Sequence, residues 1–225
     1  MKNKILVATA LVSMGCFFLS CNNGKTSSSD EVDSSRNQMA QHGTMDSNQM
    51  QMDNSMMQSM NGTMAKMNDM KMTGDFDLDF ANMMMMHHQA AIDMSEVEVA
   101  KGSDAQIKTM AQNIITAQKA EIEQMQQFVK NYKMPEAKMD KGEMHNELGE
   151  TMKTMMDKMM GMQMTGNTDK DFVMMMIPHH ESAVTMAEDE ISHGKKLELK
   201  KMAQKMIADQ SKEISEFKAW LANQK

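Results

Sequence analysis

Cysteine, proline and aromatic residues are scarce in this chain. Of 225 residues, two are cysteine, two are proline, and aromatic residues make up 4%. Both cysteines, Cys16 and Cys21, lie near the start, so residues 22–225 contain no thiol. This absence excludes disulfides, thiolate metal sites and a cysteine nucleophile from most of the chain, and it suits an oxidising compartment.

Other features that particular functions require are also missing. The formal net charge of −7 leaves no basic excess, which argues against nucleic acid as a partner. The sequence has no Ser-His-Asp order, phosphate-cradling glycine loop or Cys-x-x-Cys motif, so hydrolysis, nucleotide use and dithiol exchange are not indicated. Alternation of β-branched and aromatic residues is nowhere sustained, which leaves no strand signal. We therefore expect an all-α protein that is not an enzyme.

Residues 1–21 have the features of an export signal rather than of a folded element. Lys2 and Lys4 form a basic start, and residues 5–19 form an apolar run too short for an ordinary membrane-spanning helix. The segment ends in Phe-Leu-Ser-Cys, which resembles a bacterial lipobox, where the cysteine becomes the lipidated first residue. We predict export to the cell envelope, as a periplasmic or outer-membrane-associated lipoprotein, with membrane attachment only through Cys21.

Methionine is the residue in excess, with 36 copies. We expect residues 22–73 to be a disordered tether followed by a segment in which Met alternates with polar residues. Two interpretations of that segment stay open: a weak amphipathic helix over residues 54–70, or a mobile string of thioethers that captures soft metal ions. The accessory capture ligands would be Met39, His42 and Met45.

The rest of the chain contains an internal duplication. Adding 92 to a position between residues 64 and 129 gives its counterpart without a gap. The segment MMMMHHQAAIDM at residues 83–94 thus corresponds to MMIPHHESAVTM at residues 175–186. The repeats extend over about residues 74–132 and 166–224, and a register kept this long indicates duplication of one structural unit.

Each repeat is predicted to form a helical hairpin. Gly102 and Gly194 are natural C-caps that separate the two helices of each hairpin. From the two hairpins we predict a four-helix bundle with a pseudo-twofold axis over residues 74–225. We also predict an additional Met-rich linker helix at residues 143–164. The four bundle helices are expected at residues 77–101, 104–132, 169–193 and 196–223.

Helical spacing places polar side chains on the inward faces of these helices. At 100° per residue, one stripe of the first helix carries Phe80, Met83, Met84, His87, Ala91, Met94 and Glu98. His88 lies at the edge of this stripe. The second helix carries Gln118 and Glu121 inward, and the second repeat reproduces the pattern. A buried polar group without a partner costs on the order of 1–3 kcal/mol, so its repetition needs a reason.

Two explanations of the inward polar residues are open. His87, Gln118 and Glu121 could satisfy one another in a structural hydrogen-bond network. Alternatively the stripe binds metal, because a Met pair lies one turn before His87 in one repeat and His179 in the other. Soft thioether sulfur and borderline imidazole suit Cu(I) or Ag(I) far better than Mg, Ca or Mn. We favour a Met-His site for Cu(I), with Cu(II) and Ag(I) as further candidates.

The predicted site residues fall into two groups. Ligands are expected among the Met and His side chains, and further ligands or hydrogen-bond acceptors for imidazole among the inward carboxylates and amides. The first group is Met83, Met84, His87, His88, Met94, Met175, Met176, His179, His180 and Met186. The second group is Glu98, Gln118, Glu121, Glu190, Gln210 and Glu213.

Two other classes of function compete with copper binding. Ferritin-like di-iron sites use Glu-x-x-His, whereas this chain has Met at the Glu position in Met84-x-x-His87, so a metal oxidase is the weaker candidate. A structural alternative is a Met-rich helical protein that packs against a protein partner without metal.

The pattern Asp-Phe-x-x-Met-Met-x-x-His-His-x-x-Ala, followed by a helix with Gln-x-x-Glu-Ile, resembles the ferritin-like domain-of-unknown-function family 305 over about residues 74–224. That family includes CopM-type periplasmic copper-binding proteins. The resemblance implies an envelope helical bundle that binds copper through the Met and His residues of the two motifs. We therefore expect a role in metal sequestration, tolerance or delivery, with other envelope copper-handling proteins as partners.

Overall fold

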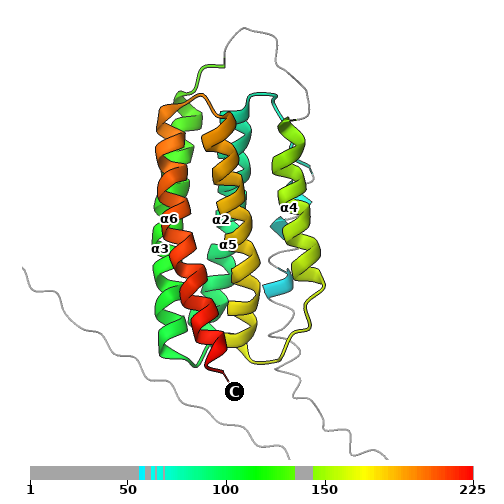
Figure 1. The fold of residues 1–225 in the computed structure, drawn as a ribbon, viewed down its shortest axis with the longest axis vertical. Coiled ribbons are helices and arrows are strands. Elements are labelled where there is room, and N and C mark those ends of the chain that lie inside the picture. Colours follow the sequence, from blue (N-terminus) through cyan, green and yellow to red (C-terminus); the bar gives the residue numbers. More distant parts are fainter. Residues whose placement is uncertain (1–55, 59–61, 64, 68, 135–143, 225) are drawn as a thin grey trace, which may run out of the picture. The chain divides into compact units, whose positions relative to one another are not determined.

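The fold is described from a computed structural model, which covers residues 56–58, 62–63, 65–67, 69–134 and 144–224 (Figure 1). The expected export signal, the expected lipidation site at Cys21 and most of the Met-rich segment, including Met39, His42 and Met45, lie outside the described residues. The side chains of residues 144–146 are not described either.

The described part of the chain is helical and contains no strand. Short helical pieces at residues 56–58, 62–63 and 65–67 precede the bundle. The longer helices are α2 (Phe76–Lys101), α3 (Ala105–Asn131), α4 (Met144–Met160), α5 (Thr168–His193) and α6 (Leu197–Ala222). The prediction of an all-α bundle built from two helical hairpins is therefore confirmed.

Pairing of the helices follows the duplication. Helix α2 packs along α3 and α5 packs along α6, which gives the two hairpins, and the hairpins meet mainly through α2 and α5. Helix α4 lies against α5, outside the four bundle helices (Figure 1). No helix among the described residues combines the length and the apolarity that crossing a membrane requires.

A buried carboxylate from each hairpin holds the turn of the other one. Asp169, at the start of α5, accepts hydrogen bonds from the backbone N–H groups of Ser103 and Asp104, both at 2.8 Å. Asp77, at the start of α2, accepts from the backbone N–H groups of Lys195 and Lys196 at 2.9 and 2.7 Å. The start of each central helix thus lies beside the end of the other, so α2 and α5 run antiparallel.

The predicted C-cap glycines are in place, but for a different physical reason from the one expected. Gly102 and Gly194 have φ of −63° and −60°, so neither uses the left-handed conformation that glycine permits. A Cβ at either position would overlap the carboxyl group of Glu98 or Glu190, one turn earlier. The glycines are required by this close approach.

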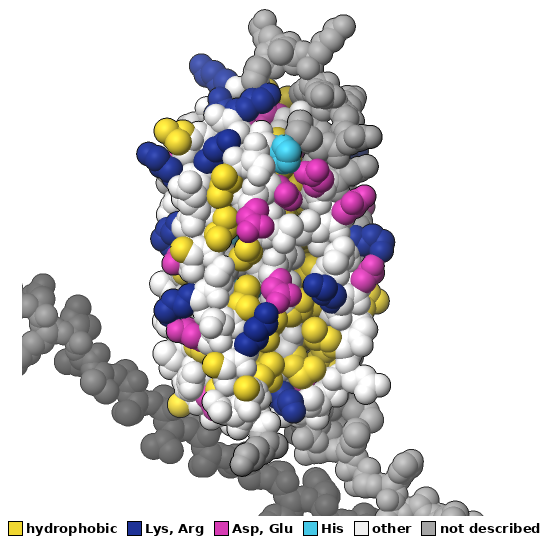
Figure 2. Space-filling view, viewed as in Figure 1, with side chains coloured by type: hydrophobic (Ala, Val, Ile, Leu, Met, Phe, Trp, Pro, Cys, Tyr) yellow, Lys and Arg dark blue, Asp and Glu magenta, His cyan; other side chains and the backbone are white. Residues whose placement is uncertain are grey.

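Methionine supplies much of the core. Among the core side chains exposed by no more than 1% are Met84, Met94, Met175, Met176 and Met186. The unbranched thioether side chain fills irregular gaps between helices, so these residues pack with Phe80 and Phe172 without many aromatic residues. Positively charged lysines and negatively charged carboxylates are interspersed on the outer surface (Figure 2).

Candidate metal centre

The two His-His motifs meet in the middle of the bundle. His87, His88, His179 and His180 are each exposed by no more than 1%. The rings of His87, from α2, and His179, from α5, lie close together in a tilted arrangement, with centroids 3.7 Å apart and planes inclined by 37°. Because one ring comes from each repeat, the duplicated motifs converge on one shared centre at the interface between the hairpins.

The other two histidines flank this ring pair. The ring centroid of His88 is 6.3 Å from that of His87, and the centroid of His180 is 6.1 Å from that of His179. The His88 Nε2 atom lies 2.9 Å from Glu121 Oε2, and His180 Nε2 lies 2.8 Å from Glu213 Oε2. Each outer imidazole thus lies beside a carboxylate from the second helix of its own hairpin. The His88–Glu121 contact is a hydrogen bond, whereas His180 and Glu213 are at ion-pair distance without hydrogen-bond geometry.

The position of His88 differs from the sequence prediction, which placed it at the edge of the buried stripe. Its side chain is fully buried, and its Glu121 partner is 91% buried. The reason is that α2 contacts α3, α5 and α4, so its buried arc is wider than a stripe of roughly 100° facing one neighbour.

Ser182 is a contact of the centre that the sequence did not indicate. Its Oγ atom lies 2.7 Å from His87 Nε2, 2.7 Å from the backbone oxygen of His179 and 3.1 Å from the Sδ atom of Met155 on α4. The counterpart of Ser182 in the first repeat is Ala90, so the duplication gave no signal for this residue.

The buried polar atoms do not form a self-sufficient hydrogen-bond network. Glu121 pairs with His88 and not with His87, and Gln118 Oε1 has no hydrogen-bond partner among the described residues. Both ring nitrogens of His179 and the Nδ1 atom of His87 also lack such a partner in the described part of the protein. A metal ion can bind the free lone pairs of such buried nitrogens and so replace the missing hydrogen bonds. The residues present therefore fit a metal centre.

Electrostatics keep the inner imidazoles neutral. Burial lowers the pKa of His87 well below its ordinary value, and the neighbouring histidines lower it further. Burial, together with His180 and His88, lowers the pKa of His179 in the same way. A neutral imidazole has one nitrogen with a free lone pair, which is the form that binds metals.

The predicted thioether ligands are buried on the same two helices. Met83 and Met84 lie one turn before His87, and Met175 and Met176 lie one turn before His179. All four are exposed by no more than 5%, as are Met94 and Met186, about two turns beyond the histidines. No group of three or more His, Cys, Asp or Glu side chains in the described residues is arranged to hold a metal ion.

Glu98 and Glu190 lie at the helix ends and not beside the imidazoles. Eleven residues separate His87 from Glu98, which is about 16 Å along a helix axis. Burial, and a hydrogen bond with Asp169, raise the pKa of Glu98 to about 8. Burial and Asp77 likewise raise the pKa of Glu190 to about 9. Both carboxyl groups therefore lie near Asp169 and Asp77, which hold the hairpin turns.

The remaining predicted residues lie on the second helices. Glu121 and Glu213 contact the outer histidines, as described above. Gln118 and Gln210 are both 3% exposed and lie one turn before those carboxylates on α3 and α6. The structure therefore brings Glu121 and Glu213 to the centre and leaves Glu98 and Glu190 away from it.

Fold and site together define a class: a bundle of two duplicated helical hairpins with a buried histidine and methionine centre at their interface. The family model of DUF305, a domain of unknown function, matches residues 20–129 and 77–221, and the chain belongs to this family. The resemblance derived from the two His-His motifs is thereby confirmed.

Solved structures of similar proteins include CopM in a silver-bound form, obtained by soaking, with 32% identity over 69% of this chain and 98% of that chain and a TM-score of 0.51. CopM in the Cu(I)-bound form has 33% identity over 65% of this chain and 96% of that one, at a TM-score of 0.49. A DUF305 protein from Streptomyces coelicolor shares the fold, with 22% identity, coverage of 67% and 94%, and a TM-score of 0.53. No curated protein matches the chain.

Proposed function

We propose that this protein binds Cu(I) at the shared histidine centre and acts in copper sequestration, tolerance or delivery in the cell envelope. The observation that carries the proposal is the close pair of buried imidazoles, His87 and His179, whose ring centroids are 3.7 Å apart. Three of their four ring nitrogens have no hydrogen-bond partner in the described part of the chain. A monovalent ion bound by ring nitrogens, in the planes of the neutral imidazoles, would supply the missing interactions without placing a high charge in the core.

The donor set favours a soft ion over a hard one. Imidazole nitrogen and thioether sulfur suit Cu(I) and Ag(I), whereas Mg, Ca and Mn prefer several oxygen ligands. Glu121 and Glu213 are already paired with His88 and His180. Glu98 and Glu190 are buried at the helix ends, so they leave the centre poor in oxygen donors. Cu(II) remains a weaker candidate for the same reason.

Similarity to CopM supports the assignment. The silver-bound CopM structure shows that a related bundle takes up a soft metal ion. Silver in its monovalent state resembles Cu(I) in charge and softness, and copper is the ion of this type that cells handle. Residues 1–21 support export, which would place the protein where thioether ligands meet copper entering the envelope.

We propose a binding protein and not an oxidase. Thioethers occupy the positions where a di-iron site would need carboxylates, as at Met84 and Met176. A binding protein takes up a fixed load of metal and stops, whereas an oxidase keeps consuming oxygen as metal is supplied. Oxygen uptake in the presence of excess Cu(I) or Fe(II) distinguishes the two.

Anaerobic titration tests the proposal. The protein competes for Cu(I) with a coloured chelator of known affinity, beside a variant in which His87, His88, His179 and His180 are all changed to Ala. We expect the wild-type protein to withdraw copper from the chelator and the variant to do so at least about tenfold more weakly, a difference of 1.4 kcal/mol. Equal affinity of the two proteins, with helical content preserved in the variant, would contradict the site assignment.

A further inference from the structure

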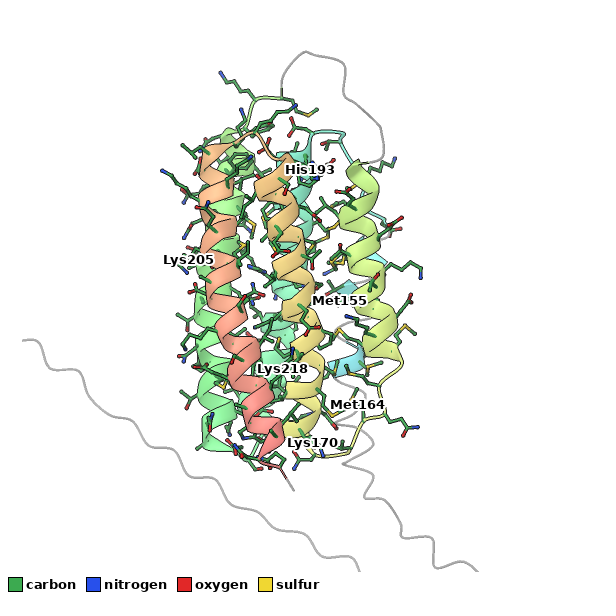
Figure 3. The ribbon with its side chains drawn as sticks, in the orientation of Figure 1. Met155, Met164, Lys170, His193, Lys205 and Lys218 are labelled. Carbon is green, nitrogen blue, oxygen red and sulfur yellow. The ribbon has the colours of Figure 1, made fainter. Side chains whose placement is uncertain are left out.

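A groove between α4 and α5 leads toward the buried histidines. It has a volume of about 370 Å³, and its lining includes Met155 and Lys158 from α4 and Pro178 and Ser182 from α5. Met155 lies between the two helices in Figure 3. The groove is therefore a feature of the seam where α4 covers the second repeat.

The inner end of this groove is one side chain away from the metal centre. Met155 and Ser182 line the groove but are only 5% and 6% exposed, so they form its floor. Ser182 Oγ lies 3.1 Å from Met155 Sδ and 2.7 Å from His87 Nε2. A thioether, a hydroxyl and an imidazole thus form a continuous line from the groove to the inner ring pair.

The outer part of the groove is acidic. Together with one lysine, Lys158, four carboxylate residues line it: Glu147, Glu150, Glu181 and Asp189. Glu181 pairs with Lys158 and with Lys218, at 3.8 and 2.8 Å, so the carboxylates still outnumber the lysines around the groove. Burial, followed by repulsion from Glu147, raises the pKa of Asp189. Acidic side chains gather beside the histidine in the upper part of the face drawn in Figure 2. Crowded carboxylates attract a cation, because its charge relieves their mutual repulsion.

The first repeat provides an internal comparison. A pseudo-equivalent groove there is lined in part by Thr63, Lys66, Met86 and Gln89, which are the counterparts of Met155, Lys158, Pro178 and Glu181. Thr63 and Ala90 stand at the positions equivalent to Met155 and Ser182, although Met70, Met85 and Met86 supply thioethers elsewhere in its lining. The position equivalent to Asp189 is Val97. The cation-attracting residues and the line to the histidine therefore occur together in one groove of the duplicated pair.

We propose that the groove between α4 and α5 is the port through which a soft monovalent cation reaches and leaves the histidine centre, with Met155 as the thioether ligand that receives the ion. This inference rests on the proposed function. The carboxylates raise the local concentration of the cation, and Met155 replaces part of its water shell. Ser182 can keep its contact with the backbone oxygen of His179 while it releases His87 Nε2 to the incoming ion.

The rate of metal transfer tests the port separately from the affinity of the centre. Under anaerobic stopped-flow conditions, Cu(I) bound to a coloured chelator is mixed with excess protein, and the absorbance change gives the transfer rate and the end point. We expect Met155→Leu to slow transfer by about fivefold or more, because leucine has no donor atom, while the end point changes by less than about twofold. The matched control is Met152→Leu, a buried methionine of the same helix that does not line the groove.

A second, independent test removes negative charge from the groove and measures the transfer rate. The double variant Glu181→Gln/Asp189→Asn should lower the transfer rate roughly two- to tenfold and weaken its dependence on ionic strength. Glu123→Gln/Glu198→Gln removes the same charge from exposed positions outside the groove and should leave the rate unchanged.

Each outcome bears on a different claim. Wild-type rates in Met155→Leu, or equal slowing in Met155→Leu and Met152→Leu, would overturn the port while leaving the centre intact. Slowing by both charge variants alike would show that net charge, and not this groove, governs entry. Failure of the wild-type protein to withdraw any copper would instead overturn the proposed function, and the port with it.

Discussion

At the scale of single residues, the two histidines of each motif have different surroundings. His88 and His180 are held by Glu121 and Glu213, whereas the inner rings of His87 and His179 face each other. A carboxylate behind an imidazole fixes the ring orientation and increases its basicity. The outer histidines therefore have carboxylate contacts, and the inner pair is available to the proposed ion.

Removing one carboxylate should reveal this difference in stability. Glu121→Ala leaves the fully buried His88 without its partner, so we expect a loss of about 1–3 kcal/mol in the free energy of unfolding. Glu213→Ala is the matched variant in the second repeat, and it should cost less because Glu213 has a side-chain exposure of 22% against 9% for Glu121. Urea denaturation of the metal-free protein measures both. An equal or smaller loss for Glu121→Ala would contradict the arrangement.

The buried glutamates at the helix ends should make stability depend on pH. The pKa of Glu98 rises from an ordinary 4.5 to about 8, so between these values the folded protein holds a proton that the unfolded chain releases. Stability from this group is complete below pH 4.5 and is lost as pH rises to about 8, and Glu190 extends the loss to about 9. We expect the free energy of unfolding to fall by on the order of 1 kcal/mol per group between pH 7 and pH 9.

Glutamine variants isolate this effect. Glu98→Gln and Glu190→Gln keep a hydrogen-bond donor toward Asp169 or Asp77 but cannot ionise, so each should flatten the decline in stability measured by urea denaturation across that range. Glu123→Gln, at an exposed position on α3, is the control and should leave the decline unchanged. A wild-type protein equally stable at both ends of the range would show that these carboxyl groups are not buried as described.

At the scale of helices, the sequence predicted the helix boundaries more accurately than it predicted side-chain contacts. The bundle helices begin and end within two residues of the expected positions, because capping residues, glycine stops and the second copy all indicate the same boundaries. The helix expected at residues 143–164 ends earlier, at Met160. Residue spacing along one helix does not show which neighbouring helix each face contacts. For this reason the sequence did not predict that His88 is buried or that Glu98 lies away from the centre.

The glycine that ends α2 gives a prediction that can be checked against a second glycine inside α4. Gly102→Ala places a Cβ where the Glu98 carboxyl group lies, and we expect it to destabilise the protein by about 1–3 kcal/mol. Gly149 lies inside α4 with no atom near its Cβ position, so Gly149→Ala should stabilise by about 0.5–1 kcal/mol. Thermal unfolding of both variants checks the opposite signs, and destabilisation by both would contradict the role assigned to Gly102.

At the scale of the whole bundle, the sequence repeat alone did not determine how many sites the two motifs form. Two copies of one motif could have formed two separate sites. The antiparallel pairing of α2 with α5, held by Asp77 and Asp169, instead brings His87 and His179 together at mid-bundle. Long-range pairing of this kind depends on how the hairpins dock, which the spacing within each repeat does not encode.

The central claim is that both repeats build one centre, and anaerobic Cu(I) titration of two double variants tests it most directly. One variant changes His87 and His88 to Ala, the other changes His179 and His180, and circular dichroism confirms that each remains helical. The account predicts that either variant loses tight copper binding completely, because a shared centre needs a ring from each hairpin. Retention of half of the tightly bound copper by each variant would show two independent sites and contradict the account.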